Sequence, residues 1–270
     1  MKTGPKMTSV SIKSLLIVFF TLQLSSVAIA ADRFFSSAGV QIRFIDEGHG
    51  TPVLLIHGYA SDIDGGWRNR GVINGLVTAG YRVVAYDNRG HGKSDKPQGV
   101  SMYGLNMVED GRRLLDYLDI DRAHVVGYSM GARFANKLRE LHPDRVVSLT
   151  VGGIGRPTAP PILTSELLEK VDQQLRDRGF RDEMERAALV AVRVSSLEIP
   201  ADETELGQNK VPMLVMIGEQ DRPERAQELA EIALNAEFKM VPGDHRAAPA
   251  TPEFLEALLE FLNAHEPNPR

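Results

Sequence analysis

The stretch Gly127-Tyr128-Ser129-Met130-Gly131 places a serine between an apolar run, residues 123–126, and a segment of helical period, residues 132–141. A sharp turn between a strand and a helix holds such a serine in a strained backbone conformation and exposes its hydroxyl to a cleft. Glycines two residues to either side let the strand and the helix approach without a clash of Cβ atoms. The pentapeptide also occurs in ordinary glycine-rich turns, but its position between strand and helix predicts a nucleophile elbow.

Short runs rich in valine and isoleucine alternate with longer segments of helical period along the rest of the chain. The expected strands are residues 53–56, 82–86, 124–126, 146–151, 213–217 and 238–241. The expected helices, whose apolar residues recur three and four positions apart, are residues 67–79, 105–118, 132–141, 224–234 and 252–262. This alternation predicts an α/β fold with a mostly parallel central sheet flanked by helices. In the helix 105–118 we expect the charged residues, Glu109 and Asp110 among them, at the solvent-facing surface.

About sixty residues separate the strand 146–151 from the strand that begins near Val211, far more than the usual few-residue connection. Thr164 is a favourable N-cap for one helix in this interval, and residues 181–194 form a second helical stretch. The interval predicts a small helical lid insertion over approximately residues 156–209. An ordinary crossover helix with long loops is the alternative.

The first thirty residues have the features of a secretory signal. Three lysines are followed by an apolar stretch over residues 15–24 and by small residues at alternate positions over 28–31. Cleavage after Ala30 would give a signal peptide, residues 1–30, and one domain, residues 31–270. We therefore expect a periplasmic or secreted protein with no stable membrane span after cleavage. A retained membrane anchor is the alternative, but the apolar stretch is short for a span of roughly 20 residues.

The charge and composition of the chain exclude several kinds of ligand. Loss of the signal removes three lysines and no acids, so the formal net charge moves from −5 to −8, which argues against nucleic acid as a partner. The chain has no cysteine and hence no disulfide, thiolate metal site or cysteine nucleophile. Asp62-Ile63-Asp64 lacks the later ligands of a calcium loop, and Gly92-Lys93-Ser94 lacks the leading glycine of a phosphate-binding loop. We expect no metal and no cofactor.

A serine nucleophile needs a neighbouring base, and histidine suits this role because its unperturbed pKa is roughly 6.5. If the chain order is serine, acid, histidine, three histidines lie downstream of the elbow: His142, His245 and His265. His142 ends the helix after the elbow, and His265 lies in the terminal tail. His245 follows the last expected strand, where the carboxyl ends of parallel strands converge on a ligand crevice. His245 is therefore the candidate base.

The candidate acid is Asp221, which follows the strand 213–217 at its carboxyl end. A buried carboxylate at this position would hold the histidine in one tautomer and stabilise its cation. The alternative role for Asp221 is an N-cap ahead of Pro223. Glu219 is the nearest substitute acid, while the side chain of Asp244 is expected to point elsewhere.

Backbone amides must stabilise the oxyanion that forms when a serine attacks a carbonyl, at about 2.7 to 3.1 Å from it. Met130 supplies one amide because it follows the serine, and Tyr59, in the loop after the first expected strand, supplies the second. His57 is expected to pack within that loop. Trp67 and Tyr103 are expected in the core.

From Val40 to Leu262 the chain resembles the α/β-hydrolase superfamily. His57-Gly58-Tyr59 is similar to the family's His-Gly-x oxyanion loop, and the segment from Asp87 to Ser94 is similar to its Asp-x-Arg-Gly-x-Gly-x-Ser turn. The elbow, the acid and the histidine follow in the family order. Ala132 departs from the many relatives that carry a further glycine there, which is expected to tighten the contact between helix and strand without abolishing activity.

The resemblance implies an ester-hydrolysing enzyme, because the elbow holds a serine where haloalkane dehalogenases and epoxide hydrolases carry aspartate. It implies a carboxylesterase type of serine hydrolase that acts on small-molecule esters or thioesters through an acyl-enzyme. The implied catalytic residues are Ser129, Asp221 and His245, with the amides of Tyr59 and Met130 as the oxyanion hole. A cofactor-free perhydrolase or haloperoxidase with the same three residues is one alternative. A non-catalytic binding protein on a hydrolase scaffold is another.

Overall fold

The computed structural model describes Met1, Gly4 and residues 32–158, 161–197, 199 and 202–267. Apart from Met1 and Gly4, the expected signal peptide, residues 1–30, lies outside these described residues. Within them, no helix combines the length and the apolar character that crossing a membrane requires.

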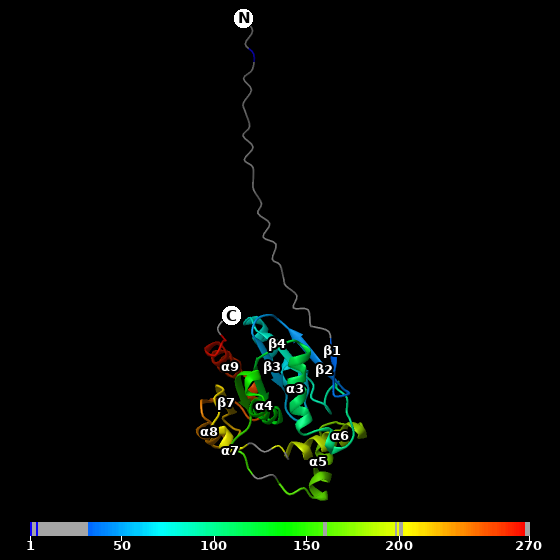
Figure 1. The fold of residues 1–270 in the computed structure, drawn as a ribbon. Coiled ribbons are helices and arrows are strands. Elements are labelled where there is room, and N and C mark those ends of the chain that lie inside the picture. The colour runs from blue at the N-terminus through cyan, green and yellow to red at the C-terminus, as the bar shows by residue number, and fades with distance from the viewer. Residues whose placement is uncertain (2–3, 5–31, 159–160, 198, 200–201, 268–270) are drawn as a thin grey trace.

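In the described part of the chain, eight strands form one sheet in the order β1-β2-β4-β3-β5-β6-β7-β8 (Figure 1). The strands are β1 (Arg33–Ser37), β2 (Val40–Glu47), β3 (Pro52–Ile56), β4 (Arg82–Tyr86), β5 (Ala123–Tyr128), β6 (Val146–Gly152), β7 (Met213–Gly218) and β8 (Ala236–Val241). Strand β2 is antiparallel to both of its neighbours, and every other pair is parallel. The expected α/β fold is confirmed.

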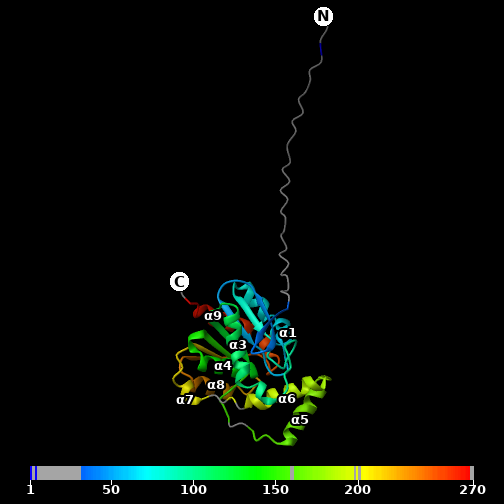
Figure 2. The ribbon, with the colours of Figure 1, turned by 45° about the vertical axis from the view of Figure 1, so that its right-hand side comes forward.

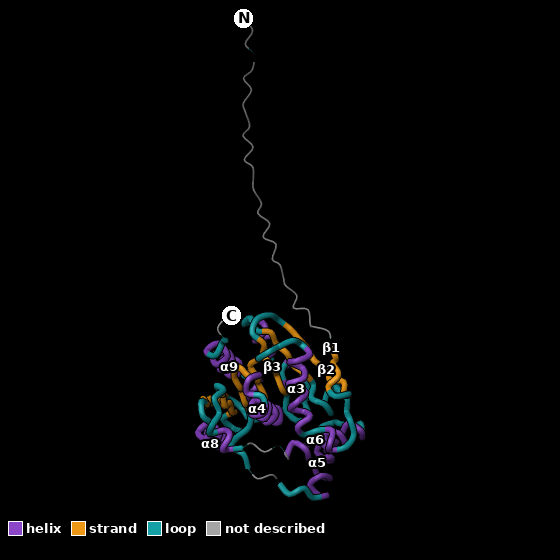
Figure 3. The backbone as a smooth tube through the Cα atoms, in the orientation of Figure 1, coloured by secondary structure: helices purple, strands orange, loops and turns teal. Residues whose placement is uncertain are grey.

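Helices cover both faces of this sheet (Figure 2, Figure 3). The α-helices are α1 (Ile63–Gly66), α2 (Val72–Thr78), α3 (Leu105–Tyr117), α4 (Met130–Leu141), α5 (Ser165–Asp177), α6 (Glu183–Leu197), α7 (Glu203–Leu206), α8 (Pro223–Ile232) and α9 (Pro252–Ala264). The 3₁₀-helices are η1 (Arg68–Arg70), η2 (Val100–Met102), η3 (Pro143–Arg145) and η4 (Ala248–Ala250).

Successive residues of a strand point to opposite faces, and the two cores divide accordingly. Leu54 of β3 belongs to a core with α3, α4 and α8, which includes Phe134. Leu55 belongs to a core with α1, α2 and α9, which includes Leu258. The carboxyl ends of the parallel strands are thereby left for the loops that carry the candidate site.

Two strands at the edge of the sheet, β1 and β2, were not among the expected elements. They form a hairpin across the two-residue turn Ala38-Gly39, with Ser37 paired to Val40. Both turn residues have positive φ, 50° and 84°, as a tight hairpin turn requires. Buried and exposed residues alternate from Phe34 across the turn to Ile42, after which consecutive residues of β2 are buried, so the strand pattern in this segment is short.

The expected helix over residues 67–79 is wrong in its first part. The segment divides into η1 and α2 because Gly71, at φ 80°, adopts a left-handed conformation that no helix continues through. Trp67 and Tyr103 are buried, as expected.

One of the charges expected on the surface of α3 is buried. Asp110 has no exposed surface and accepts two hydrogen bonds from the Arg89 guanidinium, at 2.7 and 2.6 Å. Ser37 of β1 also donates to this carboxylate. The expectation failed because the helical period distinguishes polar from apolar faces of a helix. It cannot show that an arginine from a distant loop will pack against one of the polar residues.

The interval between β6 and β7 contains α5 and α6, which lie together at one end of the molecule (Figure 1). Thr164 caps α5 as expected, because its hydroxyl accepts from the Leu167 amide at 3.2 Å. Helix α6 is joined to the loop after β3, where the Tyr59 hydroxyl donates to the Leu189 carbonyl at 3.0 Å. These helices therefore lie over the carboxyl end of the sheet. The domain boundaries and the role of residues 156–209 as a lid stay predictions.

Candidate active site

Ser129 lies in a strained turn between β5 and α4, with φ 56° and ψ −115°. A Cβ at Gly127 would overlap the Gly131 carbonyl oxygen, and one at Gly131 would overlap the Ile56 carbonyl oxygen. Only glycine allows this close approach of helix and strand. The Ser129 amide donates to the Gly152 carbonyl at 2.7 Å, so the backbone of the turn is anchored while the side chain remains free to face the pocket.

The structure brings together the three side chains that the sequence singled out. Ser129 Oγ lies 3.0 Å from His245 Nε2, and His245 Nδ1 lies 2.5 Å from Asp221 Oδ2. They come from the loops after β5, β8 and β7, at the carboxyl ends of parallel strands. The His245 side chain is 44% exposed and that of Asp221 is 11% exposed. A pocket therefore reaches the imidazole while its carboxylate partner stays shielded from water.

Neither competing acid pairs with the imidazole in the described part of the chain. Glu219 is exposed, and Asp244 accepts from the amides of Arg246 and Ala247, each at 2.8 Å. The N-cap residue of α8 is Arg222, with no side-chain cap, so Asp221 is not used for capping. The carboxylate of Asp221 is thus the one directed at the ring.

The rejected histidines have other partners. His142 contacts Glu109 at 2.7 Å, and His265 contacts the Phe261 carbonyl at 2.9 Å. His57 is fully buried, and its Nε2 accepts from the Asn88 amide at 2.9 Å. Burial lowers the pKa of His57, so this ring is a neutral acceptor that holds two loops together.

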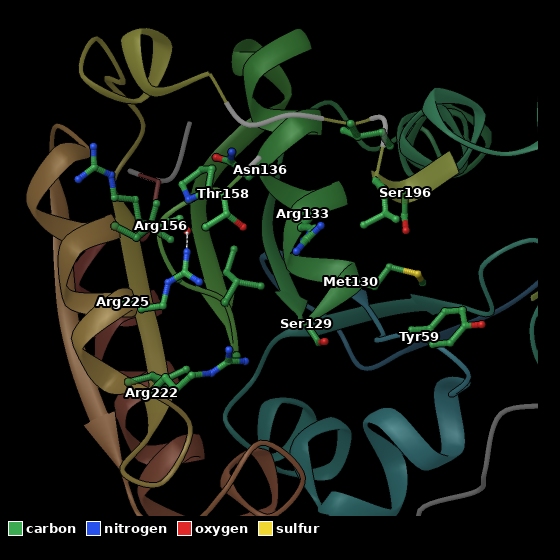
Figure 4. Close-up of a pocket in the computed structure, with 18 of the residues that line it drawn as sticks. Tyr59, Ser129, Met130, Arg133, Asn136, Arg156, Thr158, Ser196, Arg222 and Arg225 are labelled. Carbon is green, nitrogen blue, oxygen red and sulfur yellow. Dashed lines mark hydrogen bonds between the residues drawn. The ribbon is translucent and has the colours of Figure 1, made fainter. Parts of the chain in front are cut away.

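The two residues expected to supply the oxyanion donors lie close to the serine. A Cβ at Gly58 would lie 3.4 Å from Ser129 Cβ, so the loop that carries Tyr59 passes directly beside the nucleophile position. Figure 4 shows Tyr59 and Met130 on the same side of Ser129. Among the described residues, neither the Tyr59 nor the Met130 amide donates a hydrogen bond. Both amides are therefore available to a ligand oxygen, and their role stays a prediction.

The chain is similar in sequence and in fold to several known proteins. A family profile described as the alpha/beta hydrolase fold matches residues 51–189, which is half of the chain. The chain belongs to the α/β hydrolase fold family. Epoxide hydrolase A of Mycobacterium tuberculosis is 34% identical over 136 residues, covering 48% of this chain and 41% of that protein. A putative non-heme chloroperoxidase of Synechocystis sp. is 33% identical over 147 residues, covering 53% of this chain and 50% of that protein.

The matched region of this α/β hydrolase thus spans half or less of the length of these relatives. Among solved structures, a thermophilic esterase from Thermogutta terrifontis superimposes with a TM-score of 0.71 and 23% identity, covering 88% of this chain and all of that one. At this identity the likeness shows the fold.

One positioning contact in this α/β hydrolase was not foreseen. The Tyr128 hydroxyl donates to the His245 carbonyl at 2.9 Å, and the two rings lie 5.5 Å apart. Tyr128 is the residue immediately before the nucleophile position, so one side chain ties the elbow to the histidine loop. Its place inside the pentapeptide was visible in the sequence, but its partner, a backbone carbonyl 117 residues away, was not.

Ser129 and His245 open onto a pocket of about 560 Å³, within the range of small-molecule sites. Its walls come from α4, the loop after β6, α6 and α8, and they carry several arginines that sequence reasoning missed. Figure 4 shows Arg133, Arg156, Arg222 and Arg225 around this space. In the described ranges no group of three or more histidine, aspartate or glutamate side chains is arranged to hold a metal ion.

Proposed function

We propose that this protein is a serine hydrolase of the carboxylesterase type that cleaves esters or thioesters of small molecules. We also propose that residues 1–30 direct it to the periplasm or the cell exterior and are removed, which N-terminal sequencing would detect as a mature chain beginning at Ala31. The observation that carries the enzymatic proposal is the continuous hydrogen-bonded chain from Ser129 through His245 to Asp221.

In the proposed first step, Ser129 Oγ attacks the ester carbonyl carbon while His245 Nε2 takes the hydroxyl proton. Asp221 accepts the Nδ1 proton of His245 in a hydrogen bond, which fixes the tautomer and stabilises the imidazolium. The amides of Tyr59 and Met130 donate to the oxyanion of the tetrahedral intermediate. The imidazolium then returns its proton to the departing alcohol or thiol, and an acyl-serine remains.

In the second half-reaction, water attacks the acyl-serine and gives a proton to His245 Nε2. Collapse of the second tetrahedral intermediate releases the carboxylic acid, and His245 passes the proton taken from water to Ser129 Oγ. The reaction thus consumes one ester and one water and yields an alcohol and an acid. The 3.0 Å spacing between Oγ and Nε2 supports direct proton transfer without an intervening group.

The residue type of the nucleophile distinguishes the proposed esterase from an epoxide hydrolase, the activity in the name of one relative. A relative bears the name epoxide hydrolase, but its similarity covers only part of each chain. The elbow of this chain carries Ser129. The family resemblance implies that epoxide hydrolases carry aspartate at the same position. A serine with a histidine base favours an acyl-enzyme, and therefore ester chemistry.

The test is labelling with a fluorophosphonate probe, which modifies activated serines. We expect the wild-type protein to form an adduct at Ser129 and the Ser129→Ala variant to form none. A folded wild-type protein without a serine-dependent adduct would remove the enzymatic proposal and favour a binding protein on a hydrolase scaffold. Hydrolysis of 4-nitrophenyl acetate, lost in Ser129→Ala, would then separate esterase activity from mere probe reactivity.

A second candidate function is a cofactor-free perhydrolase or haloperoxidase, in which peroxide replaces water in the second half-reaction. It is favoured by the relative named a putative non-heme chloroperoxidase. A bromination assay with acetate, hydrogen peroxide and bromide measures it. Bromination faster than ester hydrolysis, and lost in Ser129→Ala, would replace the esterase proposal.

A further inference from the structure

The pocket beside Ser129 is strongly basic. Its walls contain six positively charged side chains against two carboxylates, one of which, Asp221, is bonded to His245. The six are Arg133, Lys137, Arg156, Arg193, Arg222 and Arg225. The whole chain has a formal net charge of −5. The excess of cationic side chains in the pocket walls therefore does not reflect an overall basic composition.

Three of the six cations are engaged by the protein itself. Arg156 pairs with Glu203 through contacts of 2.8 and 3.0 Å, and Lys137 pairs with Glu140 at 2.6 Å. Arg225 donates to the Arg156 carbonyl at 2.6 Å, a bond drawn in Figure 4. The charged groups of these three residues are therefore already engaged within the protein.

The other three, Arg133, Arg193 and Arg222, pair with no carboxylate among the residues that the structure describes. Each is exposed in the structure because it faces the open pocket. Figure 4 shows Arg133, from α4, and Arg222, from the loop after β7, directed into the same space as Ser129. Their guanidinium groups are therefore free to bind a ligand beside the reacting centre.

Arg133 and Arg193 act on each other across this space. Although Arg133 is exposed as a whole residue, neighbouring protein atoms partly shield its guanidinium, which lowers its pKa, and the positive charge of Arg193 lowers it further. Arg193 reaches in from α6, with its Cζ 5.9 Å from the Tyr59 ring. Two cations held close together without an anion are mutually repulsive. A negatively charged ligand group between them would relieve that repulsion.

A neighbouring pocket of about 710 Å³ continues the basic surface. It shares Tyr59 and Arg193 with the first and adds Lys170, Arg178 and Arg246, against one acid, Asp177. Loss of solvent lowers the pKa of Arg178, and the charge of Arg246 lowers it further. The approach to the serine along α5 and α6 therefore carries the same sign of charge as the pocket itself.

We infer that the substrate is an anionic ester, with a carboxylate or phosphate group held by Arg133 and Arg193 while its ester carbonyl lies at Ser129. This inference rests on the proposed esterase function and narrows its substrate class. Guanidinium groups match the geometry of carboxylate and phosphate oxygens through paired hydrogen bonds. A cleft lined by one sign of charge also raises the local concentration of an oppositely charged substrate.

Binding is tested first, without catalysis, in the Ser129→Ala protein. Isothermal titration with adipate and, in a separate arm, with phenyl phosphate would be carried out in a buffer free of both groups. We expect one of the two anions to bind and adding Arg133→Gln or Arg193→Gln to weaken binding about tenfold or more, because each removes a charged hydrogen-bond donor. Arg181→Gln, an exposed arginine beside α6 that lines neither pocket, is the matched control and should leave the affinity unchanged.

Selectivity for anionic over neutral esters is tested next in protein that retains Ser129. The ratio of kcat/KM for mono-4-nitrophenyl adipate to that for its neutral methyl ester is expected to exceed ten. In Arg133→Gln and Arg193→Gln the ratio should fall toward one, whereas Arg181→Gln should keep it. If phenyl phosphate is the anion that binds, a phosphate-bearing aryl ester and its neutral phosphate triester replace the adipate pair.

The two proposals fail in different ways. Serine-dependent hydrolysis with a charge ratio near one, and no binding of either anion, would overturn the anionic substrate and leave the esterase proposal intact. Anion binding that depends on Arg133 and Arg193, with no serine-dependent hydrolysis or probe adduct, would overturn the esterase and retain the anion site. Equal loss of affinity in Arg181→Gln would show a diffuse charge effect and overturn the assigned pair.

Discussion

At the scale of single residues, the candidate site needs a serine hydroxyl that is exposed to the pocket and a carboxylate, that of Asp221, that is shielded from water. Ser129 keeps a positive φ of 56°, which is costly for a residue with a Cβ, and the surrounding glycines and the Gly152 carbonyl hold it there. Asp221 is shielded by the loops after β7 and β8 and directs its carboxylate at one ring nitrogen. Ser129 lines the pocket, whereas the carboxylate of Asp221 is hydrogen-bonded to His245.

We predict that Asp221→Asn lowers turnover of an ester substrate by about four orders of magnitude, because the amide favours the wrong tautomer of His245. The fold should remain, since Asn has nearly the same shape. Steady-state kinetics give kcat for both proteins, and circular dichroism verifies that the variant is folded.

Glu219→Gln is the matched control for this substitution, because Glu219 is exposed two residues away in the same loop. It should change turnover little. If Glu219→Gln lowers turnover as far as Asp221→Asn is expected to, the assignment of the acid is wrong.

At the scale of elements, helix α3 shows how a buried ion pair connects distant segments. Arg89, 1% exposed, comes from the turn after β4, and Asp110, with no exposed surface, comes from the second turn of α3. Their paired contacts of 2.7 and 2.6 Å, together with the donation from Ser37 of β1, join a loop, a helix and the edge of the sheet. This network fixes the position of α3 against the strands.

We predict that Asp110→Asn lowers the free energy of unfolding by about 3 to 5 kcal/mol, because the buried Arg89 guanidinium would lose its counter-charge. Equilibrium unfolding in urea measures this change. Asp116→Asn, on the exposed side of the same helix, removes only surface ion pairs and should cost less than about 1 kcal/mol. Equal costs for the two variants would contradict a structural role for the pair.

At the scale of the whole molecule, three buried histidines couple folding to pH. Burial is the main cause that lowers the pKa of His91 to about 3 and that of His124 to about 4, and it also lowers the pKa of His57. These rings stay neutral in the folded protein, while in the unfolded chain they take up protons below pH about 6.5. Below that pH the unfolded state binds more protons, so stability is complete above pH 6.5 and falls as the pH decreases toward the folded pKa values.

We predict that the free energy of unfolding decreases between pH 6.5 and pH 5, by at most about 1.4 kcal/mol per pH unit for each buried histidine. Urea unfolding at several pH values measures the slope. His124→Gln should reduce the slope, whereas His49→Gln, at an exposed position, should not. A wild-type stability that is constant or rises over this interval would contradict the prediction.

Much of the fold and the core of the candidate site could be predicted from the sequence. The six strands from β3 to β8 and the serine, acid and histidine all lie in local patterns: an apolar run, a turn signal and a polar residue at the carboxyl end of a strand. The N-terminal hairpin, the break at Gly71 and the burial of Asp110 could not be predicted with the same certainty. The burial of Asp110 depends on Arg89, which reaches it from another segment of the chain. The hairpin and the break at Gly71 depend on positive-φ backbone conformations that the residue types permit but do not require.

The sequence by itself determined the order of strands and helices and the residue types available for chemistry, because hydrophobic period, glycine turns and chain order are local properties. Only the tertiary structure decided which acid meets His245, which carbonyl holds Tyr128, and that Arg133 and Arg193 face one pocket from two separate helices. Those outcomes depend on distances between groups 24 to 117 residues apart in the chain, and no local pattern specifies such distances.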